Sequence, residues 1–130
     1  SGGQRQRVWL AMVLAQDTPV LLLDEPTSFL DIAHQLDVLD LVRSLRDESG
    51  TTVVMVLHDL AMAARYADHL VAMKDGRIVA EGAPADVVTE ETVAEVFGLT
   101  SRVVPDPVSG TPMVVPIGRH RAGAPDPLAR

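Results

Sequence analysis

The chain has 130 residues, which is enough for one domain with a modest hydrophobic core. Its formal net charge of −7 argues against a general nucleic-acid-binding surface, because such surfaces are usually basic. The absence of cysteine excludes disulfides and thiolate chemistry, and no apolar run approaches the roughly 20 residues that span a bilayer.

Helical and strand-like patterns alternate through the first half of the chain. Apolar spacing predicts a helix over residues 4–16, with Ser1 as N-cap and the two following glycines as a flexible lead-in. The apolar run 20–23 predicts a strand buried on both faces of a parallel sheet, and residues 52–57 predict a second such strand. Between them, a helix over 32–48 is expected to begin after Asp31 and to end at Gly50.

The second half combines short helices with turn signals. Helices are predicted over 60–66, 84–88 and 90–97, the last with Thr89 as N-cap, and strands over 69–73 and 77–80 flank a hairpin turn at Lys74-Asp75-Gly76. After Gly98, prolines and glycines surround two β-like runs, 102–104 and 113–115, and the end of the chain is expected to be frayed. The alternation of helices with apolar strands predicts the α/β class.

Two groups of polar residues follow the predicted buried strands. Asp24 and Glu25 are adjacent carboxylates at the C-terminal end of the first strand, where α/β sheets place ligands; buried, they would need a cation or hydrogen-bond donors nearby. A helix N-cap after a strand is the structural alternative. His58 ends the second strand, and a structural histidine is the alternative there.

Two further groups accompany the predicted helices. Ser1-Gly2-Gly3-Gln4 opens a helix, where glycines admit close backbone approach and the helix N-terminus attracts anions. A linker or a cloning scar is the alternative. Ser28-Phe29-Leu30-Asp31 would by itself be an ordinary helix cap. Trp9 is expected to pack inside a helical subdomain, and no residues have the spacing of a metal-ligand cluster.

Together and in this order, the four groups resemble the ATP-binding-cassette (ABC) ATPase family over about residues 1–98. Ser1-Gly2-Gly3-Gln4 resembles the signature motif, residues 20–24 the Walker B strand, and Ser28–Asp31 the D-loop, with Phe29 where small residues are commoner. The resemblance implies a partial P-loop NTPase (RecA-like) core with a mostly parallel sheet and the end of the helical subdomain. Residues 99–118 would form a small β-like extension and 119–130 a disordered tail.

The resemblance also implies a role for each site residue. Asp24 would hold Mg²⁺ through water, Glu25 would act as general base on the attacking water, and His58 would contact the γ-phosphate of ATP. The residues Ser1, Gly2, Gly3 and Gln4 would cap the ATP of a partner subunit. Asp31 would lie at the same dimer interface.

The 130 residues contain no Gly-x-x-x-x-Gly-Lys-Ser/Thr sequence. Because the chain opens at Ser1, inside a motif and without Met, we interpret it as truncated. We therefore expect no ATP hydrolysis by these residues alone. We also expect unpaired strand edges to favour a non-native or strand-swapped oligomer.

Several segments resemble importer ATPases in particular. The run from Leu57 to Ala63 resembles an importer ATPase, and the tail over 106–116 is similar to the C-terminal segment of iron-siderophore, haem and vitamin B12 importer ATPases. This similarity favours an Fe(III)-siderophore importer subunit on the cytoplasmic membrane face, with a second ATPase subunit, a permease and, indirectly, a substrate-binding protein as partners, and no nucleic acid. The alternatives are a soluble non-transport ABC ATPase and a non-catalytic half that only donates its signature motif.

Overall fold

The computed structural model describes residues 2–119, 123 and 125. The chain forms two compact units, Ser1–His58 and Asp59–Arg130, and each is described here by itself. The tail expected to be disordered, residues 119–130, lies outside the described residues except for positions 119, 123 and 125. Within the described residues, no helix is both long enough and apolar enough to cross a membrane.

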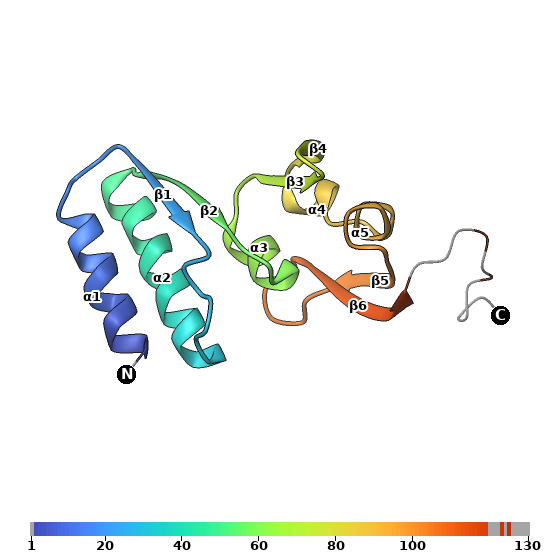
Figure 1. The fold of residues 1–130 in the computed structure, drawn as a ribbon, viewed down its shortest axis with the longest axis horizontal. Coiled ribbons are helices and arrows are strands. Elements are labelled where there is room, and N and C mark those ends of the chain that lie inside the picture. The colour runs from blue at the N-terminus through green and yellow to red at the C-terminus, as the bar shows by residue number, and fades with distance from the viewer. Residues whose placement is uncertain (1, 120–122, 124, 126–130) are drawn as a thin grey trace. The chain divides into compact units, whose positions relative to one another are not determined.

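The first unit alternates helices with two parallel strands (Figure 1). Its elements are α1 (Gly2–Leu14), β1 (Val20–Asp24), α2 (Ile32–Ser49) and β2 (Thr52–Val56). In the parallel register, Val20 lies opposite Thr52 and Asp24 lies opposite Val56. Both strands therefore run to the same edge of the sheet, and α2 provides the crossover that parallel pairing requires.

The ends of α2 follow the sequence signals. The side chain of Asp31 accepts a hydrogen bond from the backbone N–H of His34 (2.9 Å), which satisfies one of the free amides of the first turn. At the other end, Gly50 adopts a left-handed φ of 65° and its N–H donates to the carbonyl of Arg46 (3.0 Å). The predicted start and end of this helix are confirmed.

The core of the first unit lies on one face of the β1–β2 pair. Buried side chains from α1, β1 and α2 form its centre, and partly buried neighbours pack around them: Leu10, Leu21, Leu23 and Val42, then Leu14, Leu41, Leu45, Val53 and Met55. On the other face, Leu22 is 72% exposed and Val54 is 55% exposed. The prediction of strands buried on both faces is therefore wrong for this unit, because α1 and α2 cover the same face.

The second unit contains three short helices and two antiparallel hairpins. Its elements are α3 (Leu60–Tyr66), β3 (Leu70–Lys74), β4 (Arg77–Gly82), α4 (Pro84–Val87), α5 (Glu90–Phe97), β5 (Leu99–Pro105) and β6 (Pro112–Arg119). Asp75 and Gly76 both have positive φ (50° and 74°), which suits the tight turn between β3 and β4. The predicted hairpin is confirmed, and the two β-like runs after Gly98 lie inside the paired strands β5 and β6.

A buried ion pair links α3 to the turn of the β5–β6 hairpin. The guanidinium of Arg65 donates to Oδ2 of Asp106 at 2.7 Å, and the Asp106 side chain is only 8% exposed. The other carboxylate oxygen accepts from the backbone N–H groups of Val108 (2.8 Å) and Ser109 (3.1 Å). The second unit also buries small and branched apolar side chains in and next to its helices: Ala63, Ala64, Val87, Val88 and Val93.

The α/β class is confirmed, with one correction to the sheet. The described strands form three two-stranded sheets, and only β1–β2 is parallel. The expectation of a mostly parallel sheet is therefore limited to this pair. The other four strands are antiparallel because short turns join sequence neighbours, and a short connection permits only antiparallel pairing.

Candidate functional site

The candidate site lies where β1 and β2 end. Asp24 is the last residue of β1 and Glu25 follows it, while His58 stands two positions after β2. Since the strands are parallel and in register, the chain segments beyond their C-terminal ends emerge at one edge of the sheet. The apolar sequences of the two strands thus bring together residues that are 33 positions apart.

Glu25 is held by a side-chain donor on each carboxylate oxygen. Nε2 of His58 lies 2.5 Å from Oε1, and Oγ of Ser28 donates to Oε2 at 3.1 Å. Because an ionised carboxylate can only accept, Nε2 carries the proton in the contact with His58. The hydrogen bond from His58 and then that from Ser28 lower the pKa of the Glu25 carboxyl below its ordinary value, so the group stays ionised.

The loop after β1 contains two residues in the left-handed region of backbone space. Glu25 has φ +49° and Phe29 has φ +62°, and neither is glycine. Such conformations are costly for residues with a Cβ, and they cluster at functional sites. The side chain of Phe29 is fully exposed, whereas Pro26 is fully buried and anchors the loop. The loop therefore holds Glu25 in a strained backbone conformation beside its two donors.

The structure places Asp31 at the cap of α2. Its Oδ1 lies 2.7 Å from Nδ1 of His34, in addition to accepting from the backbone N–H of the same residue. The backbone hydrogen bond and then the side-chain hydrogen bond lower the pKa of the Asp31 carboxyl. About two thirds of the Asp31 side chain is exposed, so a contact with another chain remains a hypothesis for this residue.

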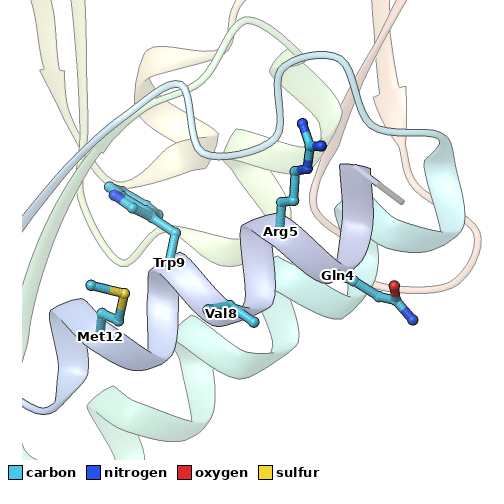
Figure 2. A pocket seen from close by; sticks show the side chains of 5 residues that line it. All are labelled: Gln4, Arg5, Val8, Trp9 and Met12. Atoms are coloured by element: carbon cyan, nitrogen blue, oxygen red, sulfur yellow. The ribbon is translucent and has the colours of Figure 1, made fainter.

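The predicted signature residues lie at the start of α1. Ser1 is outside the described residues, Gly2 and Gly3 belong to the first turn of the helix rather than to a lead-in, and Gln4 is exposed. Figure 2 shows a surface hollow lined by five side chains that all come from α1: Gln4, Arg5, Val8, Trp9 and Met12. Trp9 is 44% exposed, so its predicted place in the interior is wrong for this unit. The hollow contains none of the carboxylates at the end of β1.

The carboxylates at the end of β1 could supply some, but not all, of the ligands of a magnesium ion. Among the described residues, no group of three His, Cys, Asp or Glu side chains could form a complete metal site. Mg²⁺, however, usually binds one or two protein carboxylates and takes its remaining ligands from phosphate and water. Asp24 is exposed, and Glu25 is occupied by His58 and Ser28, so Asp24 is the residue that would hold the ion.

Sequence reasoning anticipated Asp24, Glu25 and His58 but gave no role to the hydroxyl of Ser28. A usable signal was present in the spacing. The backbone N–H of Ser28 donates to the carbonyl of Glu25 (3.2 Å), and such a turn brings the side chains of its first and fourth residues together. A serine three residues after a site carboxylate, across a proline, is therefore a candidate partner for it.

Comparisons with known proteins show which proteins the chain is similar to. The ABC transporter family matches residues 1–28. The chain is 57% identical over 119 residues to the ferric enterobactin transport ATP-binding protein FepC of Escherichia coli (strain K12), covering 92% of this chain and 44% of that protein. It is 59% identical over 121 residues to the achromobactin transport ATP-binding protein CbrD of Dickeya dadantii (strain 3937), covering 93% of this chain and 45% of that protein.

Solved structures agree with the sequence matches. An ABC transporter in an inward-facing conformation superposes with a TM-score of 0.80 at 30% identity, over 90% of this chain and 48% of that chain. The dimeric ATP-binding cassette MJ0796, bound to ADP and Pi, has a TM-score of 0.58 at 40% identity, over 64% of this chain and 35% of that chain. The chain belongs to the ABC transporter ATP-binding family. It spans less than half the length of the curated relatives named above.

Proposed function

We propose that the protein carrying this sequence is the ATP-hydrolysing subunit of an ABC importer for Fe(III)-siderophores. The contact between Glu25 and His58 carries the hydrolytic part of this proposal, because it joins a carboxylate and an imidazole at the C-terminal edge of a parallel strand pair. The siderophore part is supported by relatives whose names specify ferric enterobactin and achromobactin transport.

In the proposed reaction Glu25 orients and polarises the water that attacks the γ-phosphate. Its lowered pKa favours the ionised form, which can accept a hydrogen bond from that water. Each carboxylate oxygen has a second lone-pair direction beyond the one used by His58 or Ser28, and the Glu25 side chain is 43% exposed. The base is therefore held by its partners and still accessible.

His58 has two ring nitrogens with separate tasks in this proposal. Nε2 holds Glu25, and the side chain is 73% exposed, which leaves Nδ1 accessible. A phosphate oxygen only accepts, so a contact with it requires that Nδ1 also carries a proton. Asp24 would hold Mg²⁺ through water. The ion would supply neutralising charge to the phosphates.

The remaining assignments concern a second subunit. We propose that Ser1, Gly2, Gly3 and Gln4 cap the ATP bound by the partner of a head-to-tail dimer and that Asp31 lies at that interface. The related cassette MJ0796 is dimeric, which supports a second ATPase subunit. A membrane permease and a substrate-binding protein complete the proposed importer, with the ATPase on the cytoplasmic face.

For the 130 residues on their own we expect no ATP turnover. They contain no Gly-x-x-x-x-Gly-Lys-Ser/Thr sequence to cradle the phosphates. We also propose that their exposed strand edges favour a strand-swapped oligomer. Light scattering on the purified residues tests this, and a monomeric mass at high concentration would contradict it.

The function is tested by complementation in cells that lack the natural gene. The wild-type gene should restore uptake of radiolabelled siderophore iron, and Glu25→Gln should not. Glu48→Gln is the matched control, because Glu48 is an exposed carboxylate near the end of α2 and should behave as wild type. In ATPase assays of the purified proteins, wild type and Glu48→Gln should hydrolyse ATP and Glu25→Gln should not.

Each failure has a different meaning. Normal siderophore-iron uptake in the deleted cells, with loss of another solute, would overturn the substrate. A purified wild-type protein that binds a partner without hydrolysing ATP would favour the non-catalytic half. Hydrolysis without any transport defect would favour a soluble ABC ATPase.

A further inference from the structure

The four residues from Glu25 to Ser28 form a compact turn at the end of β1. The backbone N–H of Ser28 donates to the carbonyl of Glu25 at 3.2 Å, and Pro26 within the turn is fully buried. These two features determine the backbone of the turn without involving the hydroxyl of Ser28. The hydroxyl is therefore available for a separate task, and it donates to Oε2 of Glu25 at 3.1 Å.

The carboxylate of Glu25 would otherwise be poorly defined in orientation. The last side-chain torsion of glutamate is broad, because it joins an sp³ carbon to an sp² carbon. One donor on one oxygen leaves rotation about that torsion possible. Two donors on different oxygens, Ser28 on Oε2 and His58 on Oε1, remove most of that freedom.

We propose that Ser28 is a positioning residue for Glu25: its hydroxyl orients the carboxylate so that one oxygen meets His58 and the free lone pairs face the attacking water. This inference rests on the proposed function, since it concerns the water that Glu25 activates. Ser28 acts through Glu25 and does not itself touch the reacting atoms. A group displaced by about 1 Å can cost as much as 100-fold in rate, so orientation of the base affects kcat directly.

The test compares three variants of the natural protein in its full length. Ser28→Ala removes the hydroxyl and leaves the backbone turn, Ser28→Thr keeps a hydroxyl, and Ser44→Ala removes a hydroxyl that donates only to the carbonyl of Asp40 on α2. The kcat and KM for MgATP are measured for each variant. Thermal unfolding and circular dichroism check that each variant is folded.

We expect Ser28→Ala to lower kcat about 3- to 30-fold while KM changes less than about twofold, because a charge-assisted hydrogen bond to the base is lost and nucleotide binding is not. Ser28→Thr should retain at least about half of the wild-type kcat, and Ser44→Ala should match wild type. A crystal structure of Ser28→Ala should show Oε1 of Glu25 displaced from His58.

Three results would overturn the proposal. The first is an unchanged kcat in Ser28→Ala, and the second is an effect confined to KM. The third is equal loss of kcat in Ser28→Ala and Ser28→Thr, which would assign the effect to loop packing.

Glu25→Gln, measured in parallel, separates this inference from the proposed function. If Glu25→Gln abolishes turnover and Ser28→Ala does not alter it, only the role of Ser28 fails. If the wild-type protein shows no turnover, both fail together.

Discussion

Glu25 in the first unit and Asp106 in the second each accept several hydrogen bonds, and the two carboxylates are held in different ways. Glu25 is 43% exposed and lies in a loop with left-handed backbone, where it accepts from Ser28 of the same loop and from His58 beyond β2. Asp106, in the second unit, is 8% exposed and receives Arg65 and two backbone amides.

The difference separates a group available for chemistry from one that stabilises a turn. The charge-assisted bond from Arg65 and the amides of the turn satisfy Asp106 where little of its side chain meets water, and such a buried network stabilises structure. Glu25 keeps solvent access and has a strained, left-handed φ. A carboxylate's exposure and the origin of its donors therefore indicate its role better than the number of its hydrogen bonds.

The largest expected effect comes from removing each carboxylate in turn. In the natural full-length protein, Glu25→Gln should lower kcat for ATP by roughly 10²–10⁴-fold with little change in the thermal unfolding midpoint, because it removes a base and no packing. Asp106→Ala should leave kcat within about threefold and lower the midpoint by roughly 5–15 °C, since Arg65 loses a buried partner. The measurements are steady-state ATPase assays and differential scanning calorimetry.

The contrast between a catalytic Glu25 and a structural Asp106 fails if Glu25→Gln lowers the thermal midpoint and Asp106→Ala lowers kcat. A thermal midpoint that falls as far in Glu25→Gln as in Asp106→Ala would assign Glu25 a structural role. An unchanged thermal midpoint in Asp106→Ala would show that the turn holds without the carboxylate, through the backbone hydrogen bonds that Asp106 and Gly110 donate to the carbonyls of Thr111 and Asp106.

The second prediction concerns the one-sided core beneath Glu25. In the 130-residue chain, Leu23→Ala should cost about 2–5 kcal/mol in the free energy of unfolding of the first unit, because Leu23 is 2% exposed in the core. Leu22→Ala is the matched control, one position away on the other face, and should change that free energy by less than about 0.5 kcal/mol. Urea unfolding followed by circular dichroism measures both.

A different result would be informative about the open face of β1. If Leu22→Ala destabilises as strongly as Leu23→Ala, the face that carries Leu22 is covered in solution. The urea unfolding would then be repeated at several protein concentrations. A stability that rises with concentration would indicate a second copy on this face, and a constant stability would indicate residues of the same chain.

The smallest expected effect is a pH dependence of the second unit. The backbone N–H of Val108, then Arg65, lower the pKa of the Asp106 carboxyl from 3.8 to about 2. Since the folded-state pKa is the lower one, the carboxylate stabilises the fold fully above about pH 4, and this contribution is lost as the pH falls towards about 2. Urea unfolding of wild type and Asp106→Asn, compared across this range, should show a stability difference that shrinks on acidification. A constant difference would contradict the assignment.

Local signals were sufficient for most secondary structure. The N-cap residues Asp31 and Thr89, the left-handed Gly50 after α2, and the Asp75-Gly76 turn all act within a few residues of themselves, and each was placed correctly. Solvent exposure could not be predicted in the same way. Leu22 and Trp9 are apolar and were expected inside, but exposure depends on which elements cover a face, and sequence spacing carries no such information.

The candidate site likewise has residues that the sequence indicated and one that only the tertiary structure revealed. The order of the polar groups after two apolar strands indicated Asp24, Glu25 and His58, because parallel strands bring their C-terminal ends to one edge. The partner hydroxyl of Ser28 was missed: its spacing from Glu25 was visible in the sequence, but the contact also depends on the positive φ at Glu25, which residue type does not encode.

The sequence by itself determined the α/β class, the helix caps, the hairpin turn and the resemblance to ABC ATPases, because these depend on residue types at fixed spacings. The tertiary structure decided which face of β1 is buried, that Ser28 and His58 share one carboxylate, and that Asp106 is an internal partner of Arg65. These outcomes depend on distances between residues far apart in the chain or on a backbone conformation that side-chain chemistry alone does not select.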